Sequence, residues 1–275
     1  MEKKRICTLE EAQQVMLDIL KDVDRVCKKH NIKYFLIDGT LLGAIRHKGF
    51  IPWDDDLDIG MMREDYEKFL KIAEKELKED LYIQNVEKDK QYTLYHIPTK
   101  VRKNGTVFLE FGEENPKYHS GIYIDVFPYD KVCSNKIKEF IRQDIVSFIM
   151  KCKYEIKGKG IKALIRKTLN VLSRPISHEN LYEFSMGTVK WTNNWNGDKI
   201  NYGGELMWNK EFNYKDIFPL KPIEFQGEVF QGPNNPHNIL ENIYGDYMTL
   251  PKEEDRTWHA KDIYIVERED ERGRI

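Results

Sequence analysis

Gly39-Thr-Leu-Leu-Gly-Ala-Ile-Arg-His-Lys-Gly-Phe-Ile-Pro-Trp-Asp-Asp-Asp-Leu-Asp-Ile59 is the most informative stretch of this 275-residue chain. An apolar run at 32–37 before it predicts a strand, and Thr40 begins a short helix that we expect to end at Arg46. A glycine and a hydroxyl at a strand-to-helix turn leave free amides at the positive end of the helix dipole. We therefore expect Gly39 and Thr40 to bind phosphate, with Arg46, His47 and Lys48 close behind them.

The acidic half of the stretch predicts a cation site. Asp56 and Asp58 flank Leu57 at the start of an expected strand, 57–61, so their carboxylates would share one face about 7 Å apart. Unpaired carboxylates this close repel one another unless a cation lies between them, and hard oxygen ligands favour Mg²⁺ or Mn²⁺. Asp125 lies in a second apolar strand, 121–127, which we expect Pro128 to close. Phosphate donors beside metal-binding acids indicate phosphoryl or nucleotidyl transfer.

Three plainer interpretations compete with this one. A calcium-binding loop beginning at Asp54 would need glycine at its sixth position and glutamate at its twelfth, where this chain has Ile59 and Asp65. A solvated acidic turn without function is disfavoured by the apolar residues around the acids. For Asp125 alone, a structural ion pair remains open.

The elements around the stretch predict an α/β (α+β) fold, a small sheet layered with helices. The capping box Thr8-Leu-Glu-Glu11 begins a helix that we expect to reach His30, and a charged amphipathic helix follows at 63–77. An Asn-Gly turn predicts a hairpin between 99–102 and 107–111. Toward the C-terminus, we expect one strand at 223–230 and a helix at 236–244.

Composition excludes several classes of protein. With 44 Lys and Arg against 46 Asp and Glu, the net charge of −2 disfavours a nucleic-acid partner. The four cysteines (Cys7, Cys27, Cys133 and Cys152) form no CxxC motif, and we expect reduced thiols. The sequence shows no signal peptide and no apolar run long enough for a membrane span, so we expect a cytoplasmic protein.

The charge is unevenly distributed. Residues 131–174 contain twelve Lys and Arg and three Asp and Glu, a net charge of +9, which leaves −11 for the rest. Apolar and basic residues recur in this segment at the spacing typical of helices. It is either a solvated helical face or a surface that contacts an anionic membrane, at whose inner face the protein would then be peripheral.

The quoted stretch, with Arg63-Glu-Asp-Tyr66 and the later Tyr244-Gly-Asp-Tyr-Met248, resembles the signature of the LicD family of phosphocholine transferases. The resemblance implies a nucleotidyltransferase-like fold, a mixed β-sheet core flanked by helices, here with a basic helical insertion. The family pattern places a turn at Gly39-Thr40, an Asp-x-Asp pair at Asp56 and Asp58, and a third acid at Asp125. We accordingly divide the chain into a catalytic core (1–130), a basic helical segment (131–200) and a C-terminal segment packed on the core (201–275).

The resemblance also implies an activity. Asp56, Asp58 and Asp125 would be catalytic and would hold Mg²⁺ (or Mn²⁺), and Lys100 and Arg102 join the residues expected to clamp the diphosphate. Strand-edge Lys and Arg are, however, more often solvent-facing. The donor would be CDP-choline and the acceptor a hydroxyl of a glycan precursor, lipid-linked, of the teichoic acid or lipopolysaccharide type, with release of CMP.

Several points stay open at this stage. The donor could be another CDP-alcohol (ribitol or glycerol), the reaction could be nucleotidyl transfer with release of pyrophosphate, or the chain could be a non-catalytic binding module. A choline head group calls for aromatic rings, of which Trp53 is the first choice. Further aromatic candidates are Tyr123, Trp191, Trp195 and Trp208, and His259 is a candidate for lining the acceptor site.

Overall fold

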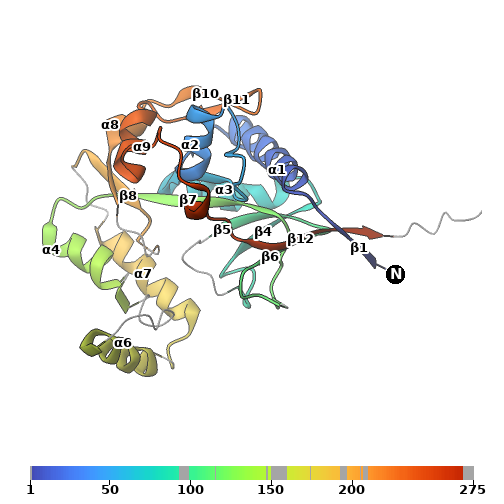
Figure 1. Cartoon of the computed structure of the whole chain (residues 1–275). Helices are drawn as coiled ribbons and strands as arrows, with labels where there is room; N and C mark the ends of the chain where they lie inside the picture. The colour runs from blue at the N-terminus through green and yellow to red at the C-terminus, as the bar shows by residue number, and fades with distance from the viewer. Residues whose placement is uncertain are drawn as a thin grey trace, which may run out of the picture.

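Figure 1 shows the computed structural model of the chain, which describes residues 2–92, 99–114, 116–146, 148–149, 160–173, 175–192, 197–204, 206 and 210–268. The elements run in the order β1 (Glu2–Ile6), α1 (Leu9–His30), β2 (Phe35–Leu36), α2 (Asp38–Arg46), β3 (Asp58–Met62), α3 (Arg63–Glu76), β4 (Leu81–Asn85), β5 (Thr99–Lys103), β6 (Thr106–Glu110), β7 (Tyr123–Lys131), α4 (Lys136–Glu139), the π-helix η1 (Phe140–Ile145), α6 (Gly160–Ser173), α7 (His178–Thr192), β8 (Lys199–Tyr202), β9 (Glu211–Asn213), α8 (Tyr214–Ile217), β10 (Lys221–Phe225), β11 (Glu228–Gly232), α9 (Pro236–Tyr244), the 3₁₀ turn η2 (Glu253–Asp255) and β12 (Ala260–Arg268). None of the helices in these ranges is long and apolar enough to cross a membrane.

The central sheet is mixed, which confirms the expected fold class. Its main path runs β2-β3-β7-β5-β4, and β8 joins β7 and carries β9. β3 and β7 are parallel, whereas the other pairs are antiparallel. A parallel pair needs a long connection, and α3, β4, β5 and β6 provide it.

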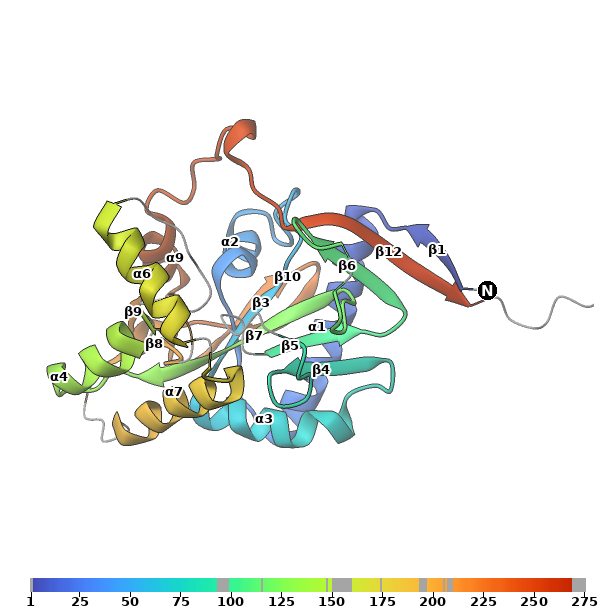
Figure 2. The same ribbon diagram turned by 90° about the horizontal axis from the view of Figure 1, so that it is seen from below.

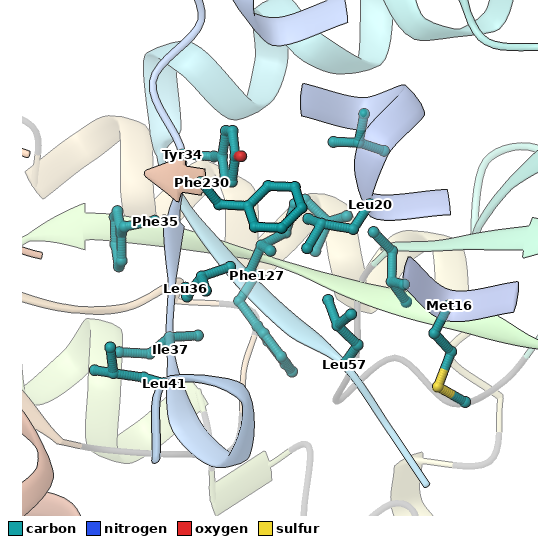
Figure 3. Close-up of a cluster of buried hydrophobic side chains, with 14 of the residues drawn as sticks. Met16, Leu20, Tyr34, Phe35, Leu36, Ile37, Leu41, Leu57, Phe127 and Phe230 are labelled. Carbon is teal, nitrogen blue, oxygen red and sulfur yellow. The ribbon is translucent and has the colours of Figure 1, made fainter. Parts of the chain in front are cut away.

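Apolar side chains from distant parts of the chain meet in one core around this sheet. The capping box at Thr8 is formed as predicted, and α1 then packs against α3 and β7. Figure 3 shows side chains of α1, α2, β7 and β11 converging with those of residues 34–37. Phe225 and Phe230 belong to the same core, so the C-terminal segment shares it.

Two further sheets complete the fold. β1, β12 and β6 form a three-stranded sheet, in which both ends of the chain pair over the registers Glu2 to Arg268 and Ile6 to Tyr264. β10 and β11 form a hairpin. Figures 1 and 2 show that α4, α6 and α7 gather at one end of the molecule, while the β1–β12 ribbon extends at the other.

Several sequence-based boundaries are wrong. The strand expected at 32–37 covers only Phe35–Leu36, and α2 begins at Asp38, before Thr40. β7 continues through Pro128 to Lys131. A proline fits there because β5 pairs with β7 only as far as Val126 and β8 begins at Tyr129, so position 128 lies between the two partners on that edge.

Two turns also differ from expectation. The Asn104-Gly105 turn is present, but β5 and β6 do not pair with each other, because β5 lies between β4 and β7 while β6 pairs with β12. The strand expected at 223–230 is instead the β10–β11 hairpin. Gln226 and Gly227 both have positive φ, +54° and +73°, the backbone of a tight hairpin turn that the residue type Gln does not reveal.

Candidate active site

Three of the predicted site residues lie in one row across the central sheet. Asp58 of β3 is directly opposite Asp125 of β7, and Asp125 is directly opposite Lys100 of β5. Opposed residues on neighbouring strands project to the same face. All three side chains are buried, and Lys100 Nζ lies 2.8 Å from Asp125 Oδ1. The expected proximity of Asp58 and Asp125 therefore follows from strand register.

Carboxylates outnumber cations in and around this row. Burial and the neighbouring carboxylates of Asp56, Asp38, Asp125 and Asp54 raise the pKa of Asp58 well above its usual range. Burial also raises the pKa of Asp125 to about 6, although Lys100 opposes the shift. Carboxylates that repel one another inside a protein favour the binding of a cation.

The loop before β3 brings a further carboxylate to the turn at Gly39. A Cβ atom on Gly39 would lie 2.9 Å from Asp54 Oδ2, so a larger residue at position 39 would displace the Asp54 carboxylate. Burial, with Asp56 and Asp55 adding to it, raises the pKa of Asp54 to about 8. Asp54 was part of the acidic cluster in the sequence, but only the fold places it against the Gly39-Thr40 turn that is expected to bind phosphate.

Asp38 is a fifth acid of the site that the sequence pattern did not single out. It begins α2 with a positive φ of +47°, and its Oδ1 accepts a hydrogen bond of 2.7 Å from the Tyr202 hydroxyl. Burial is the largest cause that raises the pKa of Asp38 to about 6, and Asp56 adds to it. Burial raises the pKa of the Tyr244 hydroxyl, and the nearby carboxylates of Asp38 and Asp58 add to the shift. A signal for Asp38 was its position before Gly39, at a sharp turn.

A histidine from the C-terminal segment closes the acidic cluster. His259 Nδ1 lies 3.1 Å from Asp55 Oδ1 and 3.5 Å from Asp56 Oδ2. The hydrogen bond that the His259 imidazole donates to Asp55 is the largest cause that raises the pKa of His259 to about 9, so the imidazole is cationic at neutral pH. The buried Asp55 carboxylate also accepts the backbone N–H groups of His259 and Ala260, which makes Asp55 an anchor for the start of β12.

The predicted phosphate clamp is only partly directed at the acids. Thr40 is buried, and its hydroxyl accepts a hydrogen bond of 2.7 Å from the backbone N–H of Asp58. Arg46 donates from Nε to His47 and from Nη1 to the backbone carbonyl of Tyr247, at 2.9 Å each. The two distant motifs of the sequence are thereby in contact. Lys48 is exposed, and its backbone has a positive φ of +60°.

Lys100 and Arg102, the weaker candidates for the diphosphate clamp, do not face solvent, which was the alternative for strand-edge residues. Both side chains are buried, because β5 lies inside the sheet. Arg102 donates to Gln84 Oε1 and to the backbone carbonyl of Gly121, 2.7 Å away. Lys100 Nζ and the Arg102 guanidinium lie 3.3 and 4.8 Å from the centre of the Tyr123 ring.

The aromatic candidates for a choline cage have other neighbours in the structure. The Arg256 guanidinium lies 4.1 Å from the ring centre of Trp53, which also contacts His47 edge-on. The Tyr123 ring is covered by Lys100. Trp191 lies on α7, half exposed, and Trp195 and Trp208 fall outside the described residues. The assignment of Trp53 to the head group stays a prediction.

The carboxylate oxygens are of the type that binds a divalent cation, although they are not arranged as a complete set of metal ligands. Within the described ranges, no three acidic, histidine or cysteine side chains form a ready metal-binding group. Mg²⁺ usually needs only one or two carboxylates, and takes waters and substrate phosphates for its other ligands. The hard oxygen donors and the excess negative charge around Asp58 match that requirement.

An acidic pair after a glycine turn, with a third acid on the adjacent parallel strand, defines a domain of the nucleotidyltransferase type. The family model LicD/FKTN/FKRP, nucleotidyltransferase domain, matches residues 31–153, the part that contains all of the acids described above. The lipopolysaccharide cholinephosphotransferase LicD of Haemophilus influenzae is 33% identical over 94% of this chain and 98% of its own length. The chain belongs to the LicD family.

Shorter matches include the following two relatives. An uncharacterised protein of Rickettsia typhi is 48% identical over 69 residues, 25% of this chain and 22% of its own length. The human ribitol 5-phosphate transferase FKRP is 48% identical over 40 residues, 14% of this chain and 8% of its own length.

Proposed function

We propose that this protein transfers phosphocholine from CDP-choline to a hydroxyl group of a cell-surface glycan precursor and releases CMP. The row Asp58, Asp125 and Lys100 is the observation that carries the proposal, since it places two acids and a cation on one buried face of the sheet. The relative from Haemophilus influenzae, which covers nearly the whole chain, is named for phosphocholine transfer and lipopolysaccharide, which supports this donor group and an acceptor of the lipopolysaccharide type.

Asp125 is the proposed general base. The acceptor hydroxyl gives its proton to the Asp125 carboxylate as its oxygen bonds to the distal phosphorus, and the bond from that phosphorus to the CMP oxygen breaks. A carboxylate whose pKa is raised to about 6 is both deprotonated and basic at neutral pH. Lys100, 2.8 Å from Asp125, holds the carboxylate in place as a positioning residue.

Asp56 and Asp58, with Asp125, would hold Mg²⁺ (or Mn²⁺), which when bound would supply positive charge to the donor diphosphate. The Gly39-Thr40 turn at the start of α2 offers backbone N–H groups to the same diphosphate. Arg46, His47 and Lys48 follow on α2 and just after it, as cationic or polar neighbours of the phosphate. His259 is cationic and lies beside Asp56, so the C-terminal segment contributes a positive charge to the edge of the site.

One alternative has an observation of its own. The match to ribitol 5-phosphate transferase FKRP favours a second candidate, transfer of phosphoribitol from CDP-ribitol, although that match covers only 14% of this chain. Nucleotidyl transfer would use the same acids but would release pyrophosphate instead of CMP.

The experiment separates these reactions by their products. The protein is incubated with Mg²⁺, an extract of lipid-linked glycans and, in separate tubes, CDP-choline, CDP-ribitol or CDP-glycerol. CMP release with CDP-choline, dependent on the extract and abolished by EDTA, is the expected result. CMP release only with CDP-ribitol supports the second candidate, and pyrophosphate release, assayed in parallel with CTP and the phospho-alcohols, would replace the proposal by nucleotidyl transfer.

A further inference from the structure

Helix α6 directs apolar side chains toward solvent. Leu164, Val171 and Leu172 are 64%, 48% and 66% exposed. Positions i, i+7 and i+8 lie on one face of a helix, so these three side chains form a row. Ser173, on a different face, is buried. A surface helix of a globular protein normally turns its apolar side chains inward, and here these three are turned outward.

The same helix carries only positive charge. Its residues Gly160–Ser173 include Lys162, Arg166 and Lys167 and contain no Asp or Glu. The whole segment 131–174 has a net charge of +9, whereas the rest of the chain has −11. A basic helix with an exposed apolar face is the pattern of helices that lie in the surface of a membrane.

Neighbouring helices add exposed apolar side chains at the same end of the molecule. Ile137 of α4 is 74% exposed and Phe140 of η1 is 56% exposed. On α7, Phe184 and Trp191 are both about half exposed and seven positions apart, on one face. Lys138 Nζ lies 4.8 Å from the centre of the Trp191 ring. Figures 1 and 2 show α4, α6 and α7 grouped together, at the end opposite the β1–β12 ribbon.

We propose that this helical end, the exposed apolar side chains of α4, η1, α6 and α7 with the lysines among them, docks on an anionic lipid bilayer. The apolar side chains enter the region between head groups and acyl chains, the tryptophan lies at head-group depth, and the lysines contact lipid phosphates. The positive charge of the segment is complementary to an anionic surface, which selects a bilayer over a neutral apolar partner. The docking goes beyond the proposed function, because it needs neither donor nor acceptor.

Sedimentation with vesicles tests the proposal without any substrate. The full-length protein is mixed with sucrose-loaded vesicles of phosphatidylcholine and phosphatidylglycerol in equal parts, or of phosphatidylcholine alone, and is then pelleted. We expect the protein to pellet with the anionic vesicles at low salt and to be largely released at high salt, since salt screens the phosphate contacts. It should stay in the supernatant with the neutral vesicles.

Matched variants distinguish the helical end from the remaining surface. Leu164→Ser with Leu172→Ser should weaken binding to the anionic vesicles about tenfold, because two side chains no longer enter the bilayer. The control pair Phe111→Ser, in the turn after β6, with Val229→Ser, in β11, also removes exposed apolar side chains and should bind like the wild type. Lys167→Glu should weaken binding about fivefold or more, whereas Lys215→Glu, exposed on α8, should not.

Three outcomes would overturn the proposal. These are no pelleting of the wild type at low salt, equal pelleting with neutral vesicles, and equal effects of the test and control pairs. If the wild type instead dimerises in analytical ultracentrifugation, without binding vesicles, and the Leu164→Ser, Leu172→Ser pair is monomeric, the surface binds a second copy and the bilayer is excluded. Unfolding midpoints of all variants, close to that of the wild type, confirm that these exposed substitutions leave the fold intact. The two proposals are tested separately, because the vesicle assay contains neither donor nor acceptor. A protein that releases CMP from CDP-choline but does not pellet with anionic vesicles refutes only the docking, and one that pellets without releasing CMP refutes only the proposed function.

Discussion

The hydroxyl of Thr40 accepts a hydrogen bond from the backbone N–H of Asp58, with 2.7 Å between oxygen and nitrogen. Thr40 belongs to the first turn of α2 and Asp58 is the first residue of β3. The bond therefore fixes the turn expected to bind phosphate against the strand that carries the acid row. Both residues are buried, so water cannot replace either partner.

Thr40→Val is the sharpest test of this contact, because it keeps the size and branching of the side chain and removes the acceptor. The Asp58 N–H would be left buried and unpaired, at a cost of about 1–3 kcal/mol in the free energy of unfolding. Urea unfolding measures the loss, and CMP release should fall as the start of β3 shifts. Thr40→Ser, which keeps the oxygen, should be close to the wild type in both; a Thr40→Val variant as stable as the wild type would show that the hydrogen bond contributes nothing.

Asp58→Asn should abolish turnover while making the folded protein more stable at neutral pH. The pKa of Asp58 is raised by burial and by its acidic neighbours, so the ionised carboxylate destabilises the fold above its unfolded pKa. Asparagine removes that charge at nearly constant shape. The melting temperature should rise at pH 7 and the rise should vanish at acidic pH, where the wild-type carboxyl group is protonated. Near-normal CMP release by this variant would refute the assignment of Asp58 to the metal.

Local patterns were sufficient to predict much of this architecture. The capping box at Thr8, the apolar runs that predict β3 and β7, and the glycine turn at Gly39 depend on residues close in sequence, so local patterns are enough to predict them. The family resemblance implied that Asp58 and Asp125 lie close together, and the register of the parallel strands β3 and β7 accounts for it. The sequence pattern also showed the uneven charge of the helical segment.

Contacts between distant segments could not be predicted in this way. Tyr202 meets Asp38 across 164 residues and His259 meets Asp55 across 204 residues. No spacing rule links such pairs. Lys100 has the residue type of a surface position, but β5 is an inner strand, and the partner that makes its burial tolerable is Asp125 on the adjacent strand. Strand neighbours, unlike helix periodicity, depend on topology.

Gly43→Ala should destabilise the fold, and Gly187→Ala should not. Both glycines lie within helices, where alanine is the better residue by about 0.5–1 kcal/mol. A Cβ atom on Gly43 would lie 2.4 Å from the backbone oxygen of Gly49, whereas one on Gly187 of α7 would meet nothing within 4 Å. We expect Gly43→Ala to lower the free energy of unfolding by about 1–3 kcal/mol, since the loop after α2 must move. Gly187→Ala, measured by the same denaturant titration, should be neutral or stabilising; if both variants behave alike, α2 does not pack against this loop.

A buried ion-pair network attaches the helical segment to the central sheet. Asp130 of β7 accepts two hydrogen bonds of 2.8 Å from Arg63 and one of 2.9 Å from the backbone N–H of Gly204, and Arg142 Nη1 lies 3.6 Å away. Burial by itself would raise the pKa of Asp130, but the Arg63 guanidinium, followed by Arg142, outweighs it and holds the pKa below its usual value.

Asp130→Asn should therefore destabilise the protein in a pH-dependent manner. A carboxyl group whose pKa is lower in the folded state contributes stability above its unfolded pKa of 3.8 and loses it as the pH falls through the folded pKa. The variant leaves the partly buried Arg63 and the buried Arg142 without their shared anion, a loss of about 3–5 kcal/mol at neutral pH. Urea unfolding from pH 7 down to pH 3 should show the gap between wild type and variant narrowing below about pH 4. Asp198→Asn, an exposed position, should show no gap at any pH, and a gap for Asp130→Asn that stays constant with pH would mean that shape, and not charge, is what Asp130 contributes.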